Sequence, residues 1–172
     1  MDERNLKRSL APLGVASGIA ILMLISVKLA DYTGIPLLDQ AVPFIPPVLF
    51  RLTGTCMILI WLPVFIAGFY SLGQSGAVGQ AEKLRTGGIY RYVRNPMYAG
   101  ISCTIIGTGL LLLLTGIVIL GCAWLTMCYI QSLREEKDLT GRFGREYEEY
   151  RKTTPGFIPD ITRITKDLAG ER

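Results

Sequence analysis

The side chains best suited to chemistry lie together in residues 87–100, which read GGIYRYVRNPMYAG. This stretch lies where a glycine-rich polar loop meets a long apolar segment. Arg94 and Tyr98 are four residues apart, so they share a face if a helix begins early enough. Asn95 suits the N-cap of that helix and Pro96 its first turn, where free N–H groups favour an anion. The spacing therefore predicts one wall of a binding site.

A second polar cluster follows the last apolar segment, where Arg134, Glu135 and Glu136 lead into residues 137–150. If the two intervening apolar segments form a tight hairpin, both clusters converge at one face of a membrane. Each feature taken singly also has an ordinary explanation. Arginines and tyrosines at a membrane border commonly anchor headgroups or form an aromatic belt, and paired glycines commonly form a turn. The combination of these residues, rather than any one of them, favours a site.

The composition excludes several kinds of site. Half of the 172 residues are hydrophobic, 19% are charged and the mean hydropathy is +0.38, whereas soluble domains carry about 25% charged residues. The net charge of +4 is not arranged as a basic nucleic-acid surface. The chain has no histidine, which removes imidazole as a general base and metal ligand, and its four cysteines lack metal-ligand spacing. We therefore expect an integral membrane protein that binds neither metal nor nucleic acid.

The apolar residues form runs that predict about four transmembrane helices, at 11–30, 48–72, 97–114 and 117–133. Together they predict one all-α polytopic membrane domain over residues 1–172. An unbroken helix through the last two runs would be far too long for one crossing. These two runs are therefore expected to form a tight helical hairpin that turns around residues 114–117.

The segments between these runs set the predicted orientation. Counted along the chain, their Lys and Arg residues number three, none, four, none and nine, an alternation that places both termini in the cytoplasm. Residues 31–47, with four prolines and no basic residue, lie in the interface or dip into the bilayer. Residues 134–172 form a cytosolic tail with a short amphipathic helix around residues 146–150. We expect the protein in the cell membrane.

Residues 88–100 closely resemble the signature of the isoprenylcysteine carboxyl methyltransferase and phospholipid methyltransferase superfamily of membrane enzymes. That pattern is glycine, any residue and tyrosine, followed by Arg-His-Pro-x-Tyr-x-Gly. The second half of the pattern resembles residues that follow the last apolar run, namely Glu135–Glu136, Leu139, Phe143–Gly144, Tyr147, Tyr150 and Ile158–Pro159. The resemblance extends over about residues 70–160.

The resemblance implies S-adenosylmethionine as methyl donor, bound at the cytosolic ends of the last two helices. Its cofactor-binding residues would be Gly88, Tyr90, Arg94, Asn95, Pro96, Tyr98, Gly100, Glu135 and Glu136. Those that take part in catalysis would be Arg94, Asn95, Tyr98 and Glu135. Asn95 stands where the pattern has histidine, and Glu82 where some members have one. An amide still donates and accepts hydrogen bonds but does not titrate near neutral pH, so cofactor binding survives this change more readily than acid–base chemistry.

The methyl acceptor stays open among a carboxylate, a thiol and an amine. A carboxylate or thiolate needs no base, and an arginine can hold a carboxylate, whereas an amine must first lose a proton. We therefore expect carboxyl O-methylation of an isoprenylcysteine-like or other lipophilic acid that enters from the membrane lipids, with N-methylation of phospholipid ethanolamine as the alternative. A four-helix membrane module without catalysis, such as a transporter subunit, is disfavoured because the interiors of the apolar runs hold no Asp or Glu.

Overall fold

The computed structural model describes residues 34–77 and 84–170, with the backbone alone for residues 72–77. Within these ranges every regular element is a helix, in the order α2 (Leu38–Ala41), α3 (Pro47–Ala77), η1 (Gly88–Arg91), α4 (Pro96–Leu111), α5 (Thr115–Phe143), α6 (Arg145–Thr153) and α7 (Ile161–Leu168). The all-helical class is therefore confirmed. The predicted first membrane helix, 11–30, and Glu82 lie outside the described residues.

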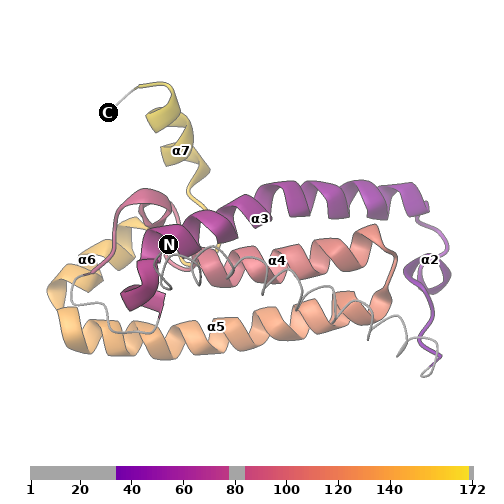
Figure 1. Ribbon diagram of the computed structural model, residues 1–172, viewed down its shortest axis with the longest axis horizontal. Helices are drawn as coiled ribbons and strands as arrows, with labels where there is room; N and C mark the ends of the chain where they lie inside the picture. Colours follow the sequence, from indigo (N-terminus) through magenta and orange to yellow (C-terminus); the bar gives the residue numbers. More distant parts are fainter. Residues whose placement is uncertain (1–33, 78–83, 171–172) are drawn as a thin grey trace, which may run out of the picture.

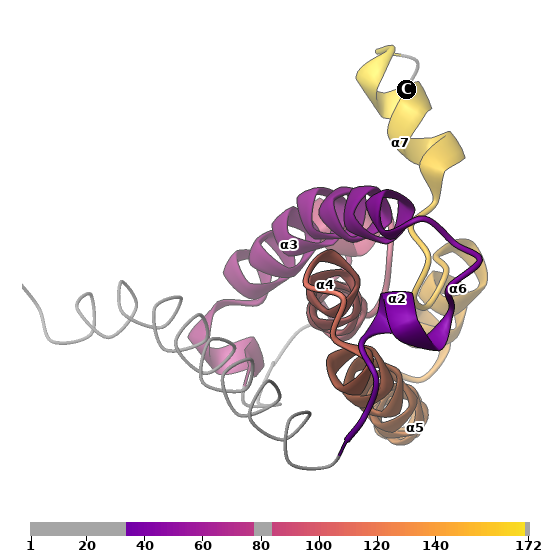
Figure 2. The ribbon, with the colours of Figure 1, turned by 90° about the vertical axis from the view of Figure 1, so that its right-hand side faces the viewer.

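Three long helices run side by side, with α4 between α3 and α5 (Figures 1 and 2). Glycines make this close packing possible, because a side chain at their positions would meet the neighbouring helix. A Cβ on Gly100 would lie 2.7 Å from backbone atoms of Phe65 in α3, and one on Gly121 would lie 2.7 Å from the side chain of Ile106 in α4. Small residues at helix crossings are the usual means of close approach between membrane helices.

Two of the helices are long and apolar enough to cross a membrane, over Pro47–Ser71 and Thr115–Phe143. Only 11% and 22% of their most apolar windows are buried within the chain, so large apolar side chains such as Leu59 and Met127 face outwards. Such surface is unusual next to water and ordinary next to lipid. The third apolar helix, α4, has 16 residues and is shorter than a typical crossing.

The connection between α4 and α5 lies earlier than expected. Residues 112–114 form it, whereas residues 115–117, part of the predicted turn, already belong to α5. Leu113 has a φ of 59°, which is rare outside glycine and must be held in place by its surroundings. The N–H of Leu38 donates a hydrogen bond of 2.9 Å to the Leu113 carbonyl. The segment before α3 thus secures this turn.

Beyond the predicted span, α5 continues without a break to Phe143, and Gly144 ends it with a φ of 52°. The short helix expected around residues 146–150 is α6. A further helix, α7, was absent from the sequence-based prediction. It projects sideways from the bundle, beyond α3, in both views (Figures 1 and 2).

Candidate active site

The polar residues before α4 form a compact approach to that helix. Residues 88–91 make one turn of 3₁₀ helix in which Tyr90 is buried, and Val93 behind it is fully buried. Asn95 occupies the N-cap position and Pro96 the first helical turn, as predicted. The side chain of Asn95, however, makes no capping hydrogen bond. Its amide is therefore available for another partner.

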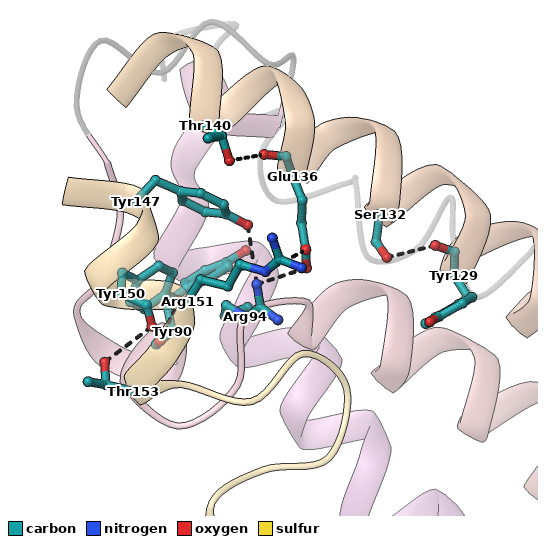
Figure 3. A network of polar contacts seen from close by, with 10 residues as sticks. All are labelled: Tyr90, Arg94, Tyr129, Ser132, Glu136, Thr140, Tyr147, Tyr150, Arg151 and Thr153. Atoms are coloured by element: carbon teal, nitrogen blue, oxygen red, sulfur yellow. Dashed lines mark hydrogen bonds and ion pairs between the residues drawn. The ribbon is translucent and has the colours of Figure 1, made fainter. Parts of the chain in front are cut away.

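The two predicted clusters meet through an ion pair. Nη1 of Arg94 lies 2.8 Å from Oε1 of Glu136 in α5, and Nε of Arg151 in α6 lies 3.3 Å from the other carboxylate oxygen. The same Nη1 donates to the hydroxyl of Tyr147 at 3.4 Å. Figure 3 shows these side chains converging from three separate segments. The network links the start of α4 to the end of α5 and to α6.

A second link joins the neighbouring residues of both motifs. The hydroxyl of Tyr98 donates a hydrogen bond of 2.5 Å to Oε1 of Glu135, and Nε2 of Gln131 donates to the same oxygen at 3.4 Å. Arg94 and Tyr98 therefore both contact α5, although α4 begins at Pro96 and Arg94 precedes it, so the two residues do not share a helical face as their spacing suggested. The two consecutive glutamates take separate partners, so each one is needed for a different contact.

A segment after α6 covers the start of α4. The N–H groups of Arg94 and Asn95 donate to the carbonyls of Pro155 and Gly156, both at 2.9 Å. A Cβ on Gly156 would lie 3.4 Å from Nη2 of Arg94 and 3.9 Å from Nδ2 of Asn95. Residues 155–156 thus act as a strap over the two side chains that the sequence singles out.

Two buried N–H groups under this strap have no hydrogen-bond partner within the described part of the chain, namely Nε of Arg94 and Nδ2 of Asn95. Burying such a group unpaired costs about 1–3 kcal/mol, so native proteins seldom leave two of them adjacent. Both groups can only donate. They indicate a place for an acceptor atom of a ligand, such as a carboxylate or hydroxyl oxygen.

The aromatic side chains of α6 fix the backbone of the approach. The Tyr150 hydroxyl donates a hydrogen bond of 2.6 Å to the carbonyl of Tyr90. Burial, with a smaller contribution from the charge of Glu135, raises the pKa of Tyr90 to about 12. Burial also raises the pKa of Tyr147 and of Tyr150. These phenols are neutral hydrogen-bonding groups at physiological pH and do not serve as bases.

Three predicted site residues, two glycines and a proline, have positions that packing or backbone conformation explains. Pro96 and Gly100 face α3, where Pro96 packs against Gly68. Gly88 is exposed and has a φ of 61°, which a glycine adopts without strain. The contacts of Pro96 and Gly100 with α3 are a packing reason for these residue types, and their place in a cofactor site stays a prediction.

Other residues of the site escaped the sequence-based prediction. Tyr147 and Tyr150 were recognised only as parts of a motif, although their spacing places them on one face of α6. No sequence pattern pointed to Arg151. None pointed to the strap either, because it makes its contacts through backbone carbonyls. Across residues 34–77 and 84–170, no group of three or more His, Cys, Asp or Glu side chains could hold a metal ion.

Comparison with known proteins gives two matches in sequence. Residues 49–146 match the phospholipid methyltransferase family. A protein-S-isoprenylcysteine O-methyltransferase of Schizosaccharomyces pombe is 40% identical over 79 residues, which make up 45% of this chain and 34% of the relative. The match therefore spans only about a third of that relative's length. No solved structure matches the chain.

Proposed function

The chain belongs to the phospholipid methyltransferase family, and from this premise we propose that it is a membrane methyltransferase that uses S-adenosylmethionine. The observation that carries the proposal is the pair of buried, unpaired N–H groups of Arg94 and Asn95. They lie where the two motifs meet through the contacts of Arg94 with Glu136 and of Tyr98 with Glu135. Two unpaired hydrogen-bond donors beneath the strap of residues 155–156 suit a polar ligand.

The residues present fit this cofactor. Nε of Arg94 and Nδ2 of Asn95 would donate to its polar groups, and the negative charge of Glu135 would favour its positive charge. The remaining residues of the proposed binding set are Gly88, Tyr90, Pro96, Tyr98, Gly100 and Glu136. When bound, S-adenosylmethionine supplies an electrophilic methyl group whose transfer to a carboxylate oxygen leaves S-adenosylhomocysteine and releases no proton.

The chain's own contribution is then to hold two reactants in line and to exclude water. The strap of residues 155–156 is hydrogen-bonded to the backbone of Arg94 and Asn95, and the nearby residues Val93 and Tyr90 are buried. Tyr98 and Glu135 fix each other across α4 and α5. None of these roles requires a side chain that gains or loses a proton near neutral pH, which agrees with the absence of histidine.

We propose that the acceptor is a carboxylate on an isoprenylcysteine-like or other lipophilic molecule that enters from the bilayer. The name of the Schizosaccharomyces pombe relative supports this acceptor, and so does the absence of histidine as a general base. The family name supports the alternative, N-methylation of a phospholipid amine. That reaction needs a proton acceptor, and Glu135 is the carboxylate that would serve.

We propose further that four helices cross the cell membrane and that both termini are cytoplasmic. The crossings would be residues 11–30, α3, the short α4 and α5. The lengths of α3 and α5 support two of them, and the basic residues near the site support a cytoplasmic position for that end of the bundle. Residues 31–47 would lie at the opposite face, since Leu38 bonds to the turn between α4 and α5.

Two measurements test the function. Calorimetry with S-adenosylhomocysteine in detergent should show binding, and its absence at millimolar ligand overturns the proposal. Membranes supplied with methyl-labelled S-adenosylmethionine should yield a labelled lipid-soluble product. Label released by mild base identifies an ester, and base-stable label identifies an amine. Tyr98→Phe and Glu135→Gln should each lower the transfer rate, whereas Glu149→Gln, in an exposed pair on α6, should not.

A further inference from the structure

The helix α7 is tied firmly to the approach to α4 although it projects away from the bundle. The Asp160 N–H donates to the carbonyl of Tyr92 at 2.9 Å, and the Asp160 side chain caps the helix at the N–H of Arg163. Near the other end, Asp167 accepts a hydrogen bond of 2.8 Å from the Tyr92 hydroxyl and lies 3.3 Å from Nη1 of Arg91. Contacts at both ends define the direction of this short helix.

One side of α7 that these contacts leave free is apolar. Ile161, Ile164 and Leu168 follow helical spacing and lie on one side, and Ile158 precedes them. Ile158, Ile161 and Leu168 are 72%, 68% and 83% exposed. Water is a poor environment for side chains as open as these. A surface that covers them would stabilise this position of α7, because removing apolar side chains from water is favourable.

The position of α7 along the length of the bundle indicates which surface covers these apolar side chains. A Cβ on Gly88 would lie 3.2 Å from Oγ of Ser71, and one on Gly68 would lie 3.1 Å from the ring of Pro96. Residues 88–96, and with them α7, therefore lie beside the last turn of the apolar span Pro47–Ser71. This is the level at which a crossing helix leaves the hydrocarbon.

The direction of the α7 axis agrees with a position at the end of the apolar span. In both ribbon views it runs across the long axis of α3, α4 and α5 and not along it (Figures 1 and 2). If the long helices cross the bilayer, α7 lies along the bilayer surface. The two acidic residues, Asp160 and Asp167, are engaged within the protein, and Lys166 lies on the side opposite the apolar face. This arrangement is typical of a helix in the membrane interface.

We propose that α7 is such an interfacial helix, with Ile158, Ile161 and Leu168 inserted among the lipids at the end of the bundle that holds the site. The lipid surface around α7 is continuous with the lipid around the apolar outer face of α3. Through the contact of Asp167 with Tyr92, the bilayer would then fix the position of residues 88–95 relative to the membrane surface. These residues include Arg94 and Asn95 of the proposed site. The proposal rests on the membrane insertion proposed above and is independent of methyl transfer.

Spin labels in lipid nanodiscs test it. Single cysteines replace Ile158, Ile161 or Leu168 in the full chain, whose four native cysteines are changed to alanine, and Lys166→Cys is the matched control. Collisions with oxygen report lipid, and collisions with a water-soluble nickel chelate report water. Leu59→Cys, on the outer face of α3, reports whether the bundle is inserted at all. Circular dichroism verifies that every variant is folded.

The expected result is an oxygen-to-nickel collision ratio several-fold higher at the three apolar positions than at residue 166. Water exposure at all four positions, with residue 59 in lipid, overturns the α7 proposal alone. Positions 158, 161 and 168 shielded from both reagents also overturn it, because protein then covers the helix, from a second copy or another part of the chain. Water exposure at residue 59 removes the shared premise of membrane insertion.

Discussion

Nη1 of Arg94 lies 2.8 Å from Oε1 of Glu136, although 41 residues that include the whole of α4 separate them in sequence. The two side chains are only 13% and 11% exposed. Charges buried to this degree are tolerated as a pair, whereas removing one of them leaves the other without compensation.

Glu136→Gln should therefore destabilise the protein by on the order of 3 kcal/mol, since Arg94 and Arg151 would both lose their carboxylate. Thermal unfolding in detergent measures the effect. The matched control is Glu149→Gln, which breaks an exposed pair with Arg145 and should change stability by about 0.3–0.5 kcal/mol. Equal shifts in the two variants would show that the buried pair has no special weight.

Asn95→Ala should weaken S-adenosylhomocysteine binding about tenfold, the loss of one hydrogen bond worth roughly 1.4 kcal/mol. The reason is that Nδ2 of Asn95 is a buried donor without a partner in the described chain. Calorimetry at neutral pH gives the affinities. Asn95→His restores the residue of the family pattern and should retain binding, with a new dependence on pH around 6.5. Unchanged affinity in Asn95→Ala would place the cofactor elsewhere.

The stability of the protein should fall as the pH rises from about 10 to about 12, because burial raises the folded-state pKa of Tyr90 from 10.0 to about 12. The protonated phenol is favoured in the fold, so this stabilisation is complete below pH 10 and disappears as the pH passes the folded-state pKa. The loss is on the order of 2 kcal/mol. Melting temperatures of wild type and Tyr90→Phe over this range should diverge, with the steeper fall in wild type, and parallel curves would contradict the assignment.

Gly54→Ala should destabilise the bundle by about 1–3 kcal/mol through overpacking. A Cβ at this position of α3 would lie 2.5 Å from the backbone N of Leu111 and would also meet the carbonyl oxygen of Gly107. Gly116→Ala is the control, since a Cβ added there would meet no neighbouring atom within 4 Å. That variant should be neutral or slightly more stable. Both are compared by unfolding in the same detergent.

The helices were the most predictable part of the fold, because lipid imposes a length and a composition that a sequence displays directly. The runs 48–72 and 117–133 lie within α3 and α5. The position of the turn was less predictable. Thr115 and Gly116 suggest a break because both disfavour helix interiors, but in the first turn of a helix that cost is small. The actual turn depends on Leu113, whose unusual φ is held by a contact with Leu38.

The contact between the two polar clusters was predictable from the sequence, whereas the contacts made by backbone groups were not. The approach of the two glutamates to Arg94 and Tyr98 follows from connectivity through two helices. The strap makes its contacts through backbone carbonyls, which every residue has, so no sequence pattern predicts it. The helix α7 has eight residues, too few for periodicity alone to distinguish it from a polar tail.

The distance in sequence between Arg94 and Tyr147 also sets an order of events at the ribosome. Their hydrogen bond spans 53 residues, so at about 5–20 residues per second the second partner emerges roughly 3–10 s after the first. During that interval Arg94, which precedes α4, lacks its hydrogen bond to Tyr147. A nascent chain stalled before α6 would thus hold the start of α4 without the contacts that Tyr147 and Tyr150 make with Arg94 and Tyr90.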